Sequence, residues 1–248
     1  MAGHSKWKNI RIRKGKQDAL RGKLFTKLGR EIIVAAKMGG GDPDTNLRLR
    51  LAIEKARENS VPKENIERAI ARGTGAVEGE NYEELVYEGV GPGGVAFMVE
   101  VYSENKNRTV GDLRHTFTKN GGSLTENGSV AWQFKHVGQI SVKKSATDED
   151  TLTLAVLDAG ADDIRSDDDE TFLVEMPLEN YGACVQALNQ AGIPIAEAGL
   201  ARIATNVANP SEDDLRKILR LYDALEEMDD VKDTYMNAEI PDDLMEEE

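Results

Sequence analysis

The chain has 248 residues, 40% of them hydrophobic, and a formal net charge of −14. Its length exceeds one usual domain, so two or three domains are expected. No segment approaches the roughly 20 apolar residues of a membrane span, and the N-terminus lacks the apolar core of a secretory signal, so we expect a cytoplasmic protein. Cys184 is the single cysteine, which excludes an internal disulfide and a multi-cysteine metal site.

The charge is distributed very unevenly. The first thirty residues contain ten Lys or Arg and one acid, Asp18, and residues 1–75 contain 18 bases and 8 acids, whereas the remaining 173 residues contain 13 bases and 37 acids. A concentrated basic segment in an acidic protein indicates a polyanionic partner such as nucleic acid, although a solubilising tail would have the same composition. The candidate nucleic-acid contacts are the bases of this leader and Trp7, whose ring can stack on a base. They are Lys6, Trp7, Lys8, Arg11, Arg13, Lys14, Lys16, Arg21, Lys23, Lys27 and Arg30.

Residues 1–78 are predicted to form a basic helical domain. Leu20, Leu24, Leu28 and Ile32 recur at steps of four, which indicates one apolar stripe with Lys23, Lys27 and Arg30 on other faces. Asp42 and Pro43 have the pattern of a cap and a first-turn proline. The predicted helices cover 17–37, 43–58 and 62–73, and a turn-rich connection follows over 73–81.

Alternating apolar residues replace this pattern after residue 79. They predict strands at 85–88, 95–101 and 130–134, and a helix over 109–119 with Thr109 and Asp112 in capping-box spacing. The glycines between 89 and 94 resemble a dinucleotide-binding motif, but a strand follows them where that motif needs a helix, so a hairpin turn is favoured.

The segment 136–205 has the order strand, helix, strand, strand, helix, strand, which is typical of the ferredoxin-like unit. A helix over 211–228 and a strand over 231–236 then need an incomplete sheet with which to pack. We therefore expect segment 136–205 to be inserted into a discontinuous middle domain formed by 79–135 and 206–240, with an acidic tail at 241–248. The predicted fold class is α+β and multidomain, a helical N-terminal domain followed by two α/β domains.

A second possible contact with nucleic acid lies at the start of the predicted helix near residue 109. Lys106, Arg108 and Arg114 add positive charge there, and a helix N-terminus attracts anions. Plain helix capping by Asn107 or Thr109 is the simpler alternative. The acids between Asp229 and Glu248 suggest that the C-terminus shields the basic leader, and a solvated tail is again the simpler alternative.

Enzymatic chemistry is disfavoured by the motifs. The sequence contains no nucleophile elbow, no P-loop and no carboxylate pair of defined spacing, and its three histidines are not in metal-ligand spacing. We expect neither a cofactor nor a metal.

Several short motifs in order make the chain similar to the YebC/PmpR family. They include Gly3-His4-Ser5-Lys6-Trp7-Lys8, Pro62-Lys63-Glu64-Asn65-Ile66, Gly91-Pro92-Gly93-Gly94-Val95 and Gly128-Ser129-Val130; Thr125 stands where the family usually has glycine. The resemblance implies three domains and a DNA-binding transcriptional regulator. The alternative that it implies is a ribosome-associated translation factor, with the basic arm on ribosomal or transfer RNA. In either case we expect a non-enzymatic monomer that binds nucleic acid.

Overall fold

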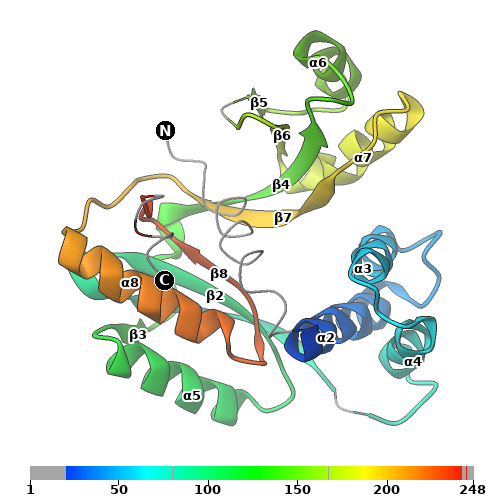
Figure 1. Cartoon of the computed structure of the whole chain (residues 1–248). Coiled ribbons are helices and arrows are strands. Elements are labelled where there is room, and N and C mark those ends of the chain that lie inside the picture. Colours follow the sequence, from blue (N-terminus) through cyan, green and yellow to red (C-terminus); the bar gives the residue numbers. More distant parts are fainter. Residues whose placement is uncertain (1–20, 80, 167, 242–243, 245–248) are drawn as a thin grey trace. The chain divides into compact units, whose positions relative to one another are not determined.

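The computed structural model describes residues 21–79, 81–166, 168–241 and 244. The chain forms two compact units, the first built from residues up to 134 together with 204 onward, and the second from 135–203. Helices come first in the described part and two small sheets with covering helices follow (Figure 1). The predicted α+β class is therefore confirmed.

The described part of the first unit begins with three helices: α2 at Arg21–Gly39, α3 at Leu47–Glu58 and α4 at Lys63–Gly73. Leu28 and Ile32 of α2 pack with Leu49, Ile53 and Ile66 in one buried cluster, as the apolar spacing predicts. The start of α3 was predicted wrongly, because residues 42–45 form a turn and Asn46 is the residue that caps the helix.

Asn46 makes a testable contribution to this helical layer. Its side-chain oxygen accepts a hydrogen bond from Leu49 N at 3.1 Å, and its amide nitrogen donates to the carbonyls of Ala35 and Gly40, each at 2.8 Å. Because Asn46→Ala removes the cap and leaves a buried carbonyl without its donor, we expect a loss of about 1 to 2 kcal/mol in the free energy of unfolding, measured by urea denaturation. Asn46→Asp keeps only the cap, so its free energy of unfolding should lie between those of Asn46→Ala and the unchanged chain. A loss below about 0.3 kcal/mol for Asn46→Ala would contradict the role of Asn46 as a cap.

A four-stranded sheet in the order β3-β1-β2-β8 follows the helices in the first unit. Helices α5 and α8 contact each other and lie on one face of this sheet (Figure 1). In the core between the sheet and these helices, the rings of Phe97 and Phe117 meet edge to face, with their centroids 5.8 Å apart. Strand β8, from the end of the chain, pairs with β2. The elements are β1 at Glu83–Val90, β2 at Ala96–Ser103, α5 at Lys106–Lys119, β3 at Ser123–Thr125, α8 at Glu212–Glu226 and β8 at Val231–Met236.

The second unit has the sheet order β5-β6-β4-β7 with two helices, α6 and α7, which is the ferredoxin-like arrangement that the element order predicts. Strands β4 and β6 are antiparallel, and the buried Ile140 lies opposite the buried Val174. The elements are β4 at Phe134–Lys143, α6 at Glu149–Leu157, β5 at Asp163–Arg165, β6 at Thr171–Met176, α7 at Tyr181–Gln190 and β7 at Glu197–Ala204.

Two further boundaries differ from the predicted ones. Helix α5 begins at Lys106, three residues early, because Asn105 caps it by accepting a hydrogen bond from Arg108 N. The predicted strand over 130–134 is a short 3-10 helix, η3, at Ala131–Gln133 that leads into β4. The backbone N–H groups of Val130 and Ala131 donate to the Glu88 carboxylate and so cannot join a strand ladder.

The glycine-rich segment between β1 and β2 forms the predicted hairpin turn. It includes η2 at Pro92–Gly94, where Gly93 and Gly94 have φ of 65° and 77°, values that favour glycine. Strand β3 was not predicted, and Thr125 lies in it in extended conformation. In the described part of the chain, Ser60 is the one non-glycine residue with positive φ.

Candidate nucleic-acid interface

Three of the predicted nucleic-acid contacts lie on α2 and point at the end of another helix. Lys23, Lys27 and Arg30 follow one side of α2 at spacings of four and three. The Lys23 ammonium donates to the Glu227 carbonyl at 3.1 Å, and the Lys27 ammonium donates to the Glu226 carbonyl at 2.7 Å. Arg30 donates to the Asp229 carbonyl. We call these three side chains and residues 226–230 the α8 clamp.

The clamp has a simple electrostatic cause. The last carbonyls of a helix have no intrahelical donor, and the helix dipole places partial negative charge there. Helix α8 has no basic residue in its own last turn, so α2 supplies the cations instead. The Glu226 carboxylate adds an ion pair with Lys27 at 3.6 Å. The end of the basic leader is therefore engaged within the first unit, whereas the sequence pattern suggested that it presents its charge outward.

Asp230 is the most connected group of the clamp, and only 7% of it is exposed. Its carboxylate accepts a hydrogen bond from Arg30 at 3.1 Å. Both carboxylate oxygens also accept from Arg108, at 3.1 and 2.9 Å. The Thr109 hydroxyl lies 2.6 Å from the same carboxylate, and the Asp230 carbonyl accepts from Tyr102 N at 2.8 Å. One buried acid therefore connects α2, α5 and β2.

Two of the three bases in the second predicted contact form ion pairs with acidic side chains. Lys106 pairs with Glu83 at 2.7 Å, and Arg108 pairs with Asp230 and with Glu104 at 3.1 Å. Hydrogen bonds to Asp230 and then Glu104 raise the pKa of Arg108, and the bond to Glu83 raises the pKa of Lys106. Arg114 is exposed and has no ion pair among the residues that the structure describes. The structure brings Arg108 together with Arg30, not with Arg114.

A second ion network attaches α3 to the sheet. Arg48 makes a bidentate pair with Glu84 at 2.9 and 3.0 Å and donates to the Tyr102 hydroxyl at 3.0 Å. Glu84 also forms an ion pair with Lys232, and Lys232 in turn pairs with the buried Glu100 at 3.1 Å. Burial lowers the pKa of Lys232, but the negative groups around it raise that pKa well above the usual value. The helical layer is thus fixed to the sheet at two places by charge.

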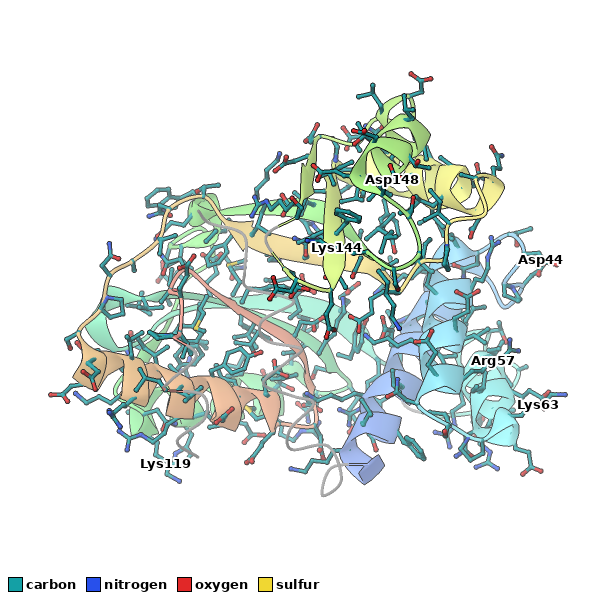
Figure 2. The ribbon with its side chains drawn as sticks, turned by 45° about the horizontal axis from the view of Figure 1, so that its top comes forward. Asp44, Arg57, Lys63, Lys119, Lys144 and Asp148 are labelled. Atoms are coloured by element: carbon teal, nitrogen blue, oxygen red, sulfur yellow. The ribbon has the colours of Figure 1, made fainter. Side chains whose placement is uncertain are left out.

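Other bases of the helical layer face solvent. Arg57 of α3 and Lys63 of α4 are both exposed (Figure 2). Lys63 pairs with Glu67 one turn along the helix, whereas Arg57 and Arg68 have no ion pair within the described ranges. Residues 6–16 of the leader lie outside the described residues, and of Arg21 only the backbone is described.

In the part of the chain that the structure describes, no group of three His, Cys, Asp or Glu is arranged to hold a metal ion. Cys184 is buried on α7, and burial raises the pKa of its thiol. Among the described helices, none has the length and apolar character that a membrane crossing requires.

The fold and the charges define a class of protein: a multidomain α+β chain with a basic helical start and two acidic sheet-containing parts. Residues 5–76 match the model of the TACO1/YebC protein N-terminal domain, and residues 82–238 match that of the TACO1/YebC second and third domain. The chain belongs to the TACO1/YebC family.

Relatives and a solved structure match most of the chain. A probable transcriptional regulatory protein of Thiobacillus denitrificans is 53% identical over 244 residues, covering 98% of this chain and all of the relative. One of Pelotomaculum thermopropionicum is 51% identical over 246 residues, with 98% and 100% covered. The crystal structure of a conserved hypothetical protein from Aquifex aeolicus superposes with a TM-score of 0.81 at 42% identity, covering 90% of this chain and 92% of that one.

Proposed function

We propose that this chain is a non-enzymatic, nucleic-acid-binding regulator of gene expression, of the transcriptional class that its relatives' names give. The observation that carries the proposal is the charge of residues 1–75, which hold 18 bases against 8 acids in a chain of net charge −14. Lys and Arg neutralise phosphates and release counterions, so such a segment has a favourable interaction with any nucleic-acid backbone.

The contacts are proposed to come mainly from the part of the leader that precedes α2. Lys23, Lys27 and Arg30 already satisfy the end of α8, so they would have to exchange those partners for phosphates. Lys6, Lys8, Arg11, Arg13, Lys14 and Lys16 carry the same type of charge and lie outside the described residues. Lys106, Arg108 and Arg114 remain a secondary candidate, with Arg114 the member that has no acidic partner in the described part.

The acidic remainder of the chain favours an oriented encounter. The second unit alone has five bases and thirteen acids over residues 135–203. Phosphate repels this unit and attracts the leader, so the chain approaches the polymer with its N-terminus first. The protein is proposed to act in the cytoplasm as a monomer.

Crosslinking in cells, followed by sequencing of the attached nucleic acid, tests the proposal. Recovery of promoter DNA is expected for a transcriptional regulator. Recovery of ribosomal or transfer RNA without promoter DNA would replace it by the translation-factor alternative, in which the same leader contacts RNA. The control is a variant with Lys6, Lys8 and Arg13 changed to Glu. If the unchanged chain recovers no more DNA or RNA than this variant does, nucleic-acid binding is overturned altogether.

A further inference from the structure

Trp132 is a large apolar ring exposed on a small, well-fixed turn of the first unit. It lies in the middle of η3, with 71% of the residue exposed. Its indole N–H donates to the Ser129 carbonyl at 3.1 Å, so the edge of the ring is held while most of its surface faces solvent. Tryptophan normally gains free energy by burial, so an exposed ring that is held in place is a candidate for contact with a ligand.

The turn that holds Trp132 is fixed from below by a buried acid. Glu88 of β1 is 5% exposed, and its carboxylate accepts the N–H groups of Gly128 at 2.6 Å, Val130 at 2.7 Å and Ala131 at 2.9 Å. Gly128 has φ of 88°, which favours glycine, and the side chain of Val130 is buried. Such an arrangement fixes the backbone beside the ring before any ligand arrives.

Polar groups fix the other end of the turn. The Gln133 carbonyl accepts from Thr205 N at 2.8 Å and from the Thr205 hydroxyl at 3.0 Å. The Gln133 side-chain oxygen accepts from the amides of Asn206 at 3.1 Å and Asn237 at 2.9 Å. Thr205 and Asn206 are exposed. The residue that follows Trp132 in the chain is therefore hydrogen-bonded to exposed residues with hydroxyl and amide groups, which are the kinds of group that can hydrogen-bond the edge of a base.

We propose that Trp132 is a stacking platform for an unpaired base of a bound nucleic acid. This inference rests on the proposed function and adds that the preferred ligand has single-stranded character, because a paired base offers no free face. A single flat ring among polar neighbours fits a base better than a protein partner, whose anchors sit in an apolar, water-excluding surround. Because the polar contacts of this turn involve no cation, the contact contributes little to salt dependence.

Fluorescence of Trp132 tests the inference directly. The chain has two tryptophans, so Trp7→Phe, which keeps an aromatic ring at that candidate contact, leaves Trp132 as the only one. This variant is titrated with a 20-residue oligouridylate and with a duplex of the same length. Quenching of the Trp132 fluorescence measures stacking, and the anisotropy of a labelled strand measures binding. We expect quenching by the single strand and not by the duplex. Binding of the single strand without quenching would overturn the inference and leave the proposed function standing.

Substitutions in the otherwise unchanged chain provide the energetic test. Trp132→Ala and Trp132→Leu should each weaken binding of the single strand about fivefold to a hundredfold with the same salt slope, and Trp132→Phe should lose less. Leu154→Ala removes an apolar side chain of a residue that is 76% exposed in the second unit and should change nothing. Full affinity in Trp132→Leu would indicate a plain apolar contact and overturn stacking. No binding by the unchanged chain in anisotropy would instead overturn the proposed function.

Discussion

Replacing Asp230 by Ala is expected to lower the free energy of unfolding of the first unit by about 3 kcal/mol, because removing one partner leaves buried charge without compensation. Arg30 has a side chain that is only 12% exposed, so it cannot recover full hydration. Thr109 loses its acceptor in the buried carboxylate as well. Arg108 is 44% exposed and can turn to water, which keeps the loss near the lower end of the range for buried pairs.

The adjacent acid provides a matched control. Asp229 is exposed, and its carbonyl, which Asp229→Ala retains, is the group that Arg30 contacts. This variant has the same change in net charge and should stay within about 0.5 kcal/mol of the unchanged chain. Urea unfolding followed by the fluorescence of Trp132 reports on the first unit, to which this residue belongs. Equal losses in the two variants would show that Asp230 contributes only through net charge.

Local patterns predicted most elements of the fold because their causes lie within a few residues. The stripe of Leu24, Leu28 and Ile32 describes the buried side of α2, and the order of elements over 136–205 gives the second unit. The errors arose where a distant group decides the local conformation. Residues 130–134 have the pattern of a strand, but the Glu88 carboxylate, about forty residues earlier, accepts the N–H groups of Val130 and Ala131.

The candidate site was predicted less completely for the same reason. Composition alone indicates a basic leader, and nothing local says that Lys23 and Lys27 meet the end of a helix about two hundred residues later. The spacing of Lys23, Lys27 and Arg30 on one side of α2, together with the absence of a base in the last turn of α8, was the available signal. Trp132 was missed because periodicity places it in a strand, where one side chain in two is buried.

Two triple variants with equal loss of charge should separate the leader into a binding part and a structural part. Lys6→Ala, Lys8→Ala and Arg13→Ala remove three bases before α2, and Lys23→Ala, Lys27→Ala and Arg30→Ala remove those of the clamp. If the unchanged chain neutralises about six phosphates, its affinity falls roughly a thousandfold between 50 and 200 mM salt. The first triple variant should flatten the slope of log affinity against log salt by about 2 to 3 and weaken binding about a hundredfold or more at 0.1 M salt.

The clamp variant is expected to behave in the opposite way. Its bases already bind the carbonyls of Glu226, Glu227 and Asp229, so their loss removes few phosphate contacts and should change the slope by less than about 1. It should instead lower the urea midpoint of the first unit, because the end of α8 and Asp230 lose their cations. Anisotropy with labelled single strands and duplexes measures the slopes. A clamp variant that is as stable as the unchanged chain, yet binds as weakly as the first triple variant, would mean that α2 releases α8 to bind nucleic acid.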